Sequence, residues 1–360
     1  MLFEMKQVYK NNETGKQSTS LFEILRADEP YDLSSGLLDF PAIEPLAWSS
    51  VAPEWCHSLA TSKVKQNITR SEFIHRFIET YKAAVFEHWD PEKQNVVFHS
   101  SGWDSRLLSW CLMKLRDKGG EGAVGNVHFI CYGPECEAFV KIMKSEGWPL
   151  SRYICLHEQG PGPLEEELVL EDAWRKLCWP ADYPLSLWSV ILEELHRSGR
   201  LSLRKEAVLW VGQYHNEFLR ESLLQKNPLV YMLGKYYGSI YTAQASAVPY
   251  EMRFPLWNEK TVELLQTAVV NYYRGSIRQQ IAERCGIIGA IQPVIISPIT
   301  RSLTLKLRAR LVKDYMKTEY AKQTGVHFDA MDIPSKLRID PFWLHWNNAS
   351  YVKQQLERDK

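Results

Sequence analysis

Short apolar runs alternate with helix-like segments between residues 95 and 211, and this alternation constrains the fold most. Asn95–His99 (NVVFH) is rich in β-branched and aromatic residues and predicts a buried strand. Arg106–Lys118 places leucines on one face and meets a Gly-Gly stop, which predicts a helix. The pattern continues with strands at Val127–Tyr132, Arg152–Leu156 and Ala207–Val211 and a helix at Glu135–Glu146. Strands separated by helices of this length predict βαβ crossovers, hence an α/β fold with a parallel sheet.

The flanking regions have other patterns. Residues 1–65 mix short apolar pieces with turn-forming residues, whereas apolar residues from Phe73 to Val85 recur at helical spacing after a possible cap at Ile68–Ser71. Helices are also predicted at Glu259–Arg274 and Thr300–Tyr320. We therefore expect three parts: an N-terminal segment (1–88), an α/β domain (89–325) and a C-terminal tail (326–360).

The composition limits the kinds of partner and the cellular compartment that we expect for this chain. Lys plus Arg equals Asp plus Glu at 43 each, so no global charge attracts nucleic acid or an acidic membrane. No apolar run approaches the roughly 20 residues of a membrane helix, and the N-terminus lacks a secretion signal. The seven cysteines include no CxxC pair, which is typical of reduced core thiols. We expect a cytoplasmic protein with no membrane partner. The balanced charge counts against a nucleic-acid partner without excluding a local basic patch.

The segment His99–Ser105 (HSSGWDS) joins the first strand to its helix. Backbone N–H groups and a helix N-terminus converge at such a turn and can bind an anion. Its serines can donate hydrogen bonds, and Asp104 can hold Mg²⁺. No GKS or GKT follows, which excludes the Walker-type P-loop. These residues also fit an ordinary turn capped by Asp104 or Ser105, so both interpretations stay open.

The segment resembles the SGGxDS signature of the ATP pyrophosphatase (PP-loop) superfamily, with Ser101 in place of the first glycine. Two further stretches resemble the synthetase domain of asparagine synthetase and its relatives. In Val208–Leu219, Gly212 and Glu217 match a G-x-G-A-D-E-L-F turn, and in Tyr250–Asn258 an E-x-R-x-P-F-L-D segment is partly kept. The resemblance spans roughly residues 90 to 310 and implies a PP-loop domain of the adenine nucleotide alpha hydrolase type.

This resemblance implies roles for individual residues. The pyrophosphate end of ATP and its Mg²⁺ would be held by the loop residues Ser100, Ser101, Gly102, Asp104 and Ser105. The second strand, at Ile130 and Cys131, would line the adenosine pocket, and Gly212 would face the α-phosphate and ribose.

For catalysis, Glu217 would lie near the acyl-adenylate and orient the metal, although a surface position on a first helical turn is its alternative. Lys306 would supply the cation near the α-phosphate, with Arg301 and Arg308 as competitors and a solvated basic helix face as the alternative. Glu251 and Arg253 fit a structural salt bridge better than catalysis, with phosphate contact as the alternative for Arg253.

The sequence also departs from the family. The glutamine-dependent members begin with a hydrolase domain whose nucleophile follows the initiator methionine, whereas this chain reads Met1-Leu2-Phe3 and has too few residues before the loop. We therefore expect free ammonia, a partner's product or an amine on the substrate as the nitrogen source. Asn216 and Asn258 replace aspartates, and Tyr214 replaces a glycine, which predicts a different acceptor pocket.

The leading hypothesis is an ATP-dependent, AMP-forming carbon–nitrogen ligase or cyclase that joins a small-molecule or peptide carboxylate to an amine or ammonia. Two alternatives remain. One is a PP-loop nucleic-acid modifier of the thiolation or lysidine type, against which the balanced charge and missing CxxC count. The other is a degenerate PP-loop protein that binds nucleotide or a partner without turnover.

Overall fold

The computed structural model describes residues 8–20, 66–132, 135–156, 198–212, 250–270 and 276–287, together with short pieces at 23–24, 43–46 and 54–61 and the single positions 192, 195, 218, 219, 248. The predicted helix Thr300–Tyr320 and the tail from residue 326 lie outside this range.

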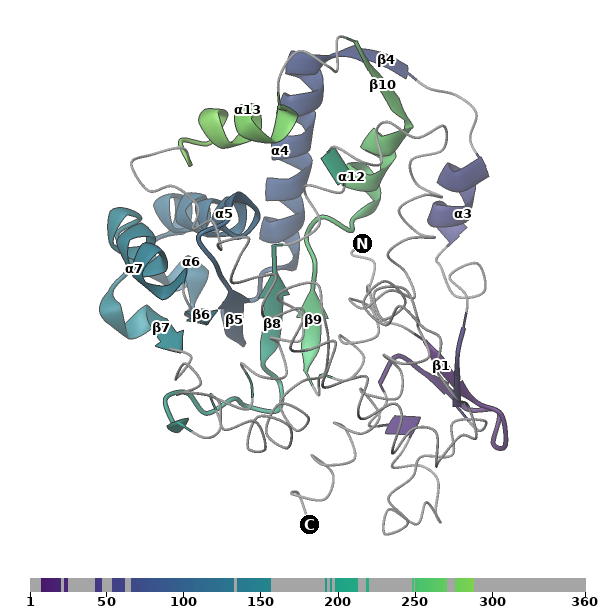
Figure 1. Ribbon diagram of the computed structural model, residues 1–360, viewed down its shortest axis with the longest axis horizontal. Coiled ribbons are helices and arrows are strands. Elements are labelled where there is room, and N and C mark those ends of the chain that lie inside the picture. The colour runs from purple at the N-terminus through teal and green to yellow at the C-terminus, as the bar shows by residue number, and fades with distance from the viewer. Residues whose placement is uncertain are drawn as a thin grey trace, which may run out of the picture.

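A five-stranded parallel sheet forms the centre of the molecule (Figure 1). Its strands in chain order are β5 (Gln94–Phe98), β6 (Asn126–Tyr132), β7 (Tyr153–Leu156), β8 (Val208–Val211) and β9 (Glu251–Arg253). They lie in the order β7-β6-β5-β8-β9, and every neighbouring pair is parallel. The predicted α/β fold with a parallel sheet is confirmed. The four predicted strands agree with β5 to β8 within one residue at each end, whereas β9 was not predicted.

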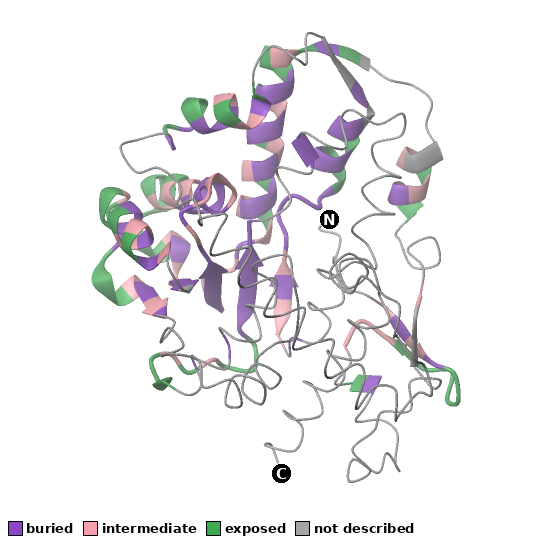
Figure 2. Cartoon of the chain, in the orientation of Figure 1, coloured by how far each residue is buried: buried purple, intermediate pink, exposed green. Residues whose placement is uncertain are grey.

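The central strands are apolar because both of their faces are covered. Every residue of β5 and β8 is buried, as the uniform purple of these strands in Figure 2 shows. Continuous apolar runs are what a parallel sheet covered on both sides requires. The polar Asn95 is accommodated because its side-chain oxygen accepts a hydrogen bond from Trp210 Nε1 at 2.8 Å.

The crossover helices follow the predicted pattern. Helix α5 (Trp103–Gly119) follows β5 and ends where Gly120 adopts a φ of 73°. The short α6 (Glu121–Val124) then leads to β6, and α7 (Cys136–Ser145) connects β6 to β7 through the 3-10 turn η4 (Leu150–Arg152). Helix α5 begins three residues earlier than the sequence indicated, so its first turn includes Asp104 and Ser105.

The long helix α4 (Arg70–His88) precedes the sheet and begins at the predicted cap, because the Thr69 side chain accepts a hydrogen bond from Glu72 N at 3.2 Å. Its buried face carries the apolar residues that predicted it, from Phe73 to Val85. Helix α13 (Ile277–Arg284) lies across α4, and α5 also packs on α4 (Figure 1).

The predicted helix Glu259–Arg274 is wrong from Leu264 to Val270, and its last four residues lie outside the described range. Helix α12 (Glu259–Glu263) and the 3-10 turn η7 (Leu264–Gln266) give way to the strand β10 (Thr267–Val270). This strand pairs in parallel with β4 (Gln66–Thr69). The β-branched Thr267, Val269 and Val270 favour a strand once a partner strand is present, and Thr267 Oγ1 donates to the Leu264 carbonyl at 2.6 Å where the turn ends.

The N-terminal residues that the structure describes form a small antiparallel sheet. It contains β1 (Tyr9–Asn11), β2 (Gln17–Ser18) and β3 (Ile43–Pro45) in the order β2-β1-β3, and helix α3 (Glu54–Thr61) follows. Six cysteines lie within the described residues, all as free thiols, and five of them are buried. In the same residues, no helix combines the length and apolar character needed to span a membrane. The division into three parts stays a prediction.

Candidate functional site

The turn after β5 lies where the strand order of the sheet reverses. The first three strands run outward from β5 to β7, and the chain then returns to place β8 on the other side of β5. In open α/β sheets, ligands bind outside the carboxyl ends of the strands at this topological switch point. The register aligns Phe98 with Ile130 on one side and with Val211 on the other. The residues that follow, His99, Cys131 and Gly212, therefore emerge at one edge.

Gly212 touches the start of α5 directly. A Cβ added at this position would lie 2.7 Å from the Asp104 carbonyl oxygen and 3.1 Å from Ser105 Cα. Both contacts are with backbone atoms, so neither can move aside like a flexible side chain. The turn Ser100–Ser105 and Gly212, which the sequence singled out separately, thus meet at the switch point.

The hydroxyls of Ser100 and Ser105 hold the turn in shape. They lie 3.0 Å apart, and Ser105 Oγ also accepts a hydrogen bond from the Ser100 backbone N–H at 3.1 Å. Ser100 Oγ accepts from the Gly102 N–H at 3.0 Å. Gly102 is the N-cap of α5 and offers no side-chain acceptor to the first helical turn. The turn is therefore not the one capped by Asp104 or Ser105 that the sequence left open, and the helix end can accept an external anion.

Ser101 points away from this turn. It is fully buried, and its hydroxyl donates a 2.6 Å hydrogen bond to Glu135 Oε1, in the turn between β6 and α7. Burial raises the pKa of Glu135, and the bond from Ser101 opposes that rise. The serine that stands in place of the family's glycine thus joins two neighbouring strand-to-helix turns. Glu135 was missed in the sequence because this contact, rather than any local motif, identifies it.

Asp104 forms an ion pair with an arginine that sequence reasoning also missed. Arg278, on α13, approaches Asp104 with N–O 2.5 Å, and its guanidinium lies 5.4 Å from the centre of the Trp103 ring. Both side chains of the pair are partly exposed and line a narrow cavity that also contacts Leu219. The guanidinium of Arg106 donates to the Ile287 carbonyl and so attaches the end of α13 to α5. The described part of the chain therefore provides a cation at the turn Ser100–Ser105.

A buried series of hydrogen-bonded side chains supports the turn after β5. His99 Nε2 lies 3.2 Å from Ser109 Oγ, and Ser109 Oγ lies 2.9 Å from Glu146 Oε1. Trp148 Nε1 donates to the second carboxylate oxygen at 3.0 Å. Burial lowers the pKa of His99 to about 3 and raises that of Glu146 to about 7. His99 is therefore neutral at physiological pH and fixes the turn by packing and hydrogen bonding rather than by charge.

The two residues expected beside adenosine lie in β6 at the same edge. Ile130 is fully buried, and its carbonyl accepts a hydrogen bond from the His99 N–H at 2.8 Å. Cys131 is also buried, with Cys136 Sγ 3.5 Å from its carbonyl oxygen. Their part in nucleotide binding stays a prediction.

The third matched stretch, Tyr250–Asn258, stabilises the fold instead of contributing to the turn after β5. Arg253 Nε donates to Glu251 Oε1 at 2.6 Å, and Lys93 Nζ lies 3.2 Å from the other oxygen of that carboxylate. Glu251 is aligned with Val208, at the amino end of β8, so this ion pair lies away from the turn after β5. Asn258 caps α12 by accepting a hydrogen bond from Thr261 N at 3.0 Å. The salt-bridge interpretation of Glu251 and Arg253 therefore agrees with the structure.

The remaining candidates lie outside the described residues. These are the two proposed catalytic residues Glu217 and Lys306 and the positions Tyr214, Asn216, Arg301 and Arg308. Among the residues that the structure does describe, no three metal-ligating side chains come together. Mg²⁺ often binds through one or two carboxylates, with substrate phosphates and water completing its shell, so Asp104 alone fits such a site.

Comparisons with known proteins add little to this geometry. No family model matches the sequence, and no curated protein is a significant match. Among solved structures, a U34-tRNA thiolase, NcsA from Methanococcus maripaludis with its 4Fe-4S cluster, is similar to this chain. The match covers 71% of this chain and 78% of that chain, with 13% sequence identity and a TM-score of 0.34. A match at this TM-score carries no argument about function, and the α/β fold stands on the strand order and register described above.

Proposed function

We propose that this chain binds ATP at the turn Ser100–Ser105 and uses it to activate a carboxylate as its adenylate, which an amine or ammonia then attacks. The observation that carries the proposal is the contact between Gly212 and the start of α5. It joins, at the switch point of a parallel sheet, Gly212 and the turn Ser100–Ser105, which belong to the two segments whose sequences resemble the ATP site of the asparagine-synthetase-like PP-loop enzymes.

The proposed chemistry explains why such a site is built from backbone donors and cations. A carboxylate oxygen attacks the α-phosphorus of ATP, the bond to the β-phosphate oxygen breaks, and pyrophosphate leaves. The amine then attacks the acyl carbon, AMP leaves with the bonding electrons, and the amine proton passes to a base. Negative charge grows on pyrophosphate in the first step, and preorganised donors stabilise it.

The chain's own groups fit these tasks. The uncapped first turn of α5 offers N–H groups and the positive end of the helix dipole to the departing phosphates. The guanidinium of Arg278 lies 2.5 Å from Asp104, in the first turn of α5. It can therefore stabilise the same negative charge on the departing pyrophosphate. Bound Mg²⁺ would supply further charge neutralisation of the phosphate oxygens. Glu217 and Lys306 stay proposed participants.

The decisive assay measures AMP and pyrophosphate release from ATP with Mg²⁺, across a panel of carboxylic acids and with hydroxylamine as the trapping amine. Formation of an acyl hydroxamate together with AMP supports the ligase, whereas ADP as the nucleotide product contradicts it. Asp104→Asn is expected to reduce turnover strongly, and Asp117→Asn serves as control, because Asp117 is an exposed carboxylate near the other end of α5.

A second candidate, nucleotide binding without turnover, is supported by one observation. The carboxylate that would hold Mg²⁺ is already paired with Arg278 at 2.5 Å. Calorimetric binding of ATP combined with no AMP formation from any acid in the panel would favour this candidate.

A further inference from the structure

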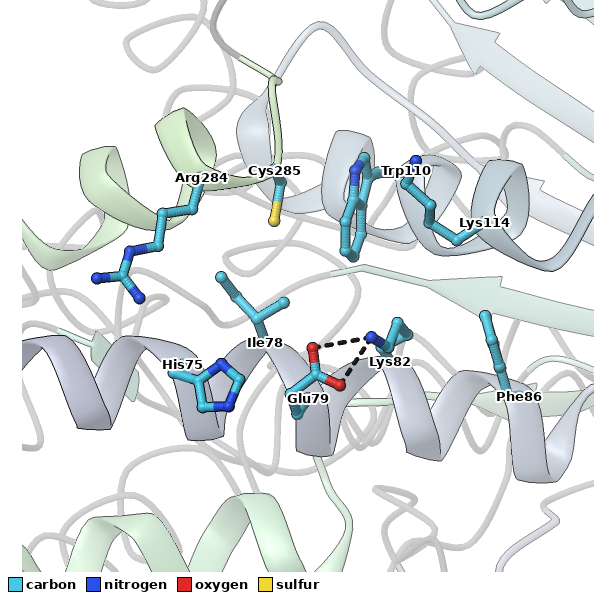
Figure 3. A pocket seen from close by; sticks show the side chains of 9 residues that line it. All are labelled: His75, Ile78, Glu79, Lys82, Phe86, Trp110, Lys114, Arg284 and Cys285. Atoms are coloured by element: carbon cyan, nitrogen blue, oxygen red, sulfur yellow. Dashed lines mark hydrogen bonds and ion pairs between the residues drawn. The ribbon is translucent and has the colours of Figure 1, made fainter. Parts of the chain in front are cut away.

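A groove of about 540 Å³ lies between three helices, outside the candidate ATP site (Figure 3). Helix α4 forms one wall, and α5 and the end of α13 form the other. It is lined by His75, Ile78, Glu79, Lys82, Phe86, Trp110, Lys114, Arg284 and Cys285. Trp110 follows Trp103 by seven residues, so it lies about 10 Å along α5 from the phosphate-binding turn. The volume of the groove falls within the range of small-molecule sites.

The middle of the groove is apolar. Ile78 and Cys285 are buried and point into the gap from opposite sides, and the partly buried indole of Trp110 points across the gap toward α4 (Figure 3). Phe86 extends the same apolar surface along α4. A flat or extended hydrocarbon body fits against such a surface, because an exposed indole face gains most from contact with another apolar group.

Cations lie around this apolar surface. Lys82 and Lys114 lie on opposite walls of the groove (Figure 3). Each has a carboxylate partner: Glu79 lies 2.7 Å from Lys82, and Asp117 lies 3.5 Å from Lys114. Arg284 differs, because its guanidinium is held by neutral groups, the hydroxyl and the carbonyl oxygen of Ser71, at 2.7 and 3.3 Å. Its positive charge therefore remains available to an anion at the α13 end of the groove.

We propose that this groove binds an elongated organic anion with a single acid group, with that group at Arg284 and its apolar body along Ile78, Cys285 and Trp110 toward Phe86. Arg284 offers a planar guanidinium that suits a carboxylate or a phosphate. His75, on the facing wall, can donate a further hydrogen bond. A nucleic-acid strand fits less well, since backbone-tracking surfaces carry a continuous stripe of cations and here Glu79 and Asp117 interrupt it.

The test uses 2-naphthoate as the probe, with binding to the full chain measured by calorimetry. The neutral isostere 2-naphthamide is expected to bind about ten-fold more weakly or worse, because it forms no charge-assisted hydrogen bond. Arg284→Gln is expected to weaken 2-naphthoate about ten-fold or more and to leave 2-naphthamide unchanged. Arg204→Gln, at an exposed arginine outside the groove, is the matched control and should change neither.

Trp110→Leu is expected to weaken both probes, since it removes the aromatic surface but keeps the groove apolar. Thermal unfolding of each variant tests whether the fold is retained. Lys114→Gln provides a second substitution, at a side chain that is more exposed than Trp110. Comparing 2-naphthoate with 2-naphthyl phosphate then identifies which acid group the site prefers. Equal affinity of wild type and Arg284→Gln for 2-naphthoate, absence of binding to the wild type at millimolar probe, or displacement of the probe by stoichiometric single-stranded RNA would each overturn the proposal.

Discussion

Replacing Gly212 by alanine tests the close approach on which the candidate site depends. Gly212 is not among the glycines with a positive φ, so its backbone conformation admits alanine. The added methyl carbon would, however, lie 2.7 Å from the Asp104 carbonyl oxygen and within 3.2 Å of two further backbone atoms of Asp104 and Ser105. Either β8 or the first turn of α5 must therefore move by several tenths of an ångström.

The size of the effect follows from two opposing contributions. Overpacking a well-filled interior by one methyl group costs about 1–3 kcal/mol. Alanine also restricts the unfolded chain relative to glycine, which returns about 0.4–1 kcal/mol. We expect a net loss of about 1–2 kcal/mol in the free energy of unfolding, and weaker ATP binding because the displaced turn is the proposed phosphate site.

Gly122 provides a matched control. It lies in α6, and a Cβ added there meets no atom within 4 Å. Gly122→Ala should therefore stabilise the chain by up to about 1 kcal/mol through helix propensity. Urea unfolding of both variants, followed by circular dichroism, measures a difference of about 2 kcal/mol between them. Two variants that agree within about 0.5 kcal/mol, or unchanged ATP affinity of Gly212→Ala, would refute this reasoning.

Three further substitutions probe the neighbouring groups. Arg278→Gln removes the competitor for the Asp104 carboxylate, so Mn²⁺ binding followed by electron paramagnetic resonance should tighten about 2–5-fold, and unchanged binding would contradict the competition. Ser101→Gly deletes the donor to Glu135 and should cost about 2 kcal/mol in urea unfolding, whereas a cost near zero would show that the bond does not stabilise the fold. Burial raises the pKa of Glu146 from 4.5 to about 7, so its contribution to stability is complete below pH 4.5 and is lost as pH rises through 7. The stability of Glu146→Gln relative to wild type should therefore increase between these pH values, by on the order of 3 kcal/mol at most, and a flat difference would contradict the shift.

Much of the central sheet could be predicted because its signals are local. The apolar runs that became β5 and β8 are short, continuous and bounded by turn residues, which leaves few alternatives to buried strands. The start of α5 was placed too late because its N-cap, Gly102, has no side chain to signal a helix start. Local patterns therefore located the elements well and their ends less well.

The errors arose where a distant partner decides the outcome. Leu264–Val270 has apolar residues at spacings compatible with a helix, and the strand β10 forms because β4 lies beside it. Arg278 belongs to an ordinary amphipathic helix, and nothing in its surroundings along the chain indicates that it reaches Asp104. Such contacts depend on the packing of α13 against α4 and α5. These helices are far apart along the chain, so no local sequence pattern predicts their contact.

The pairing of β4 with β10 has a consequence for how the chain folds and how it can be divided. It joins positions about 200 residues apart, so the entropy of closing this loop must be met before the contact can form. We expect folding to be slow and to depend on sequences from both sides of the sheet. A fragment that begins at residue 89 would lose α4 and, with it, the buried face of Phe73, Phe77 and Tyr81. The boundary between residues 88 and 89 is therefore a poor place to separate the α/β domain from the residues that precede it.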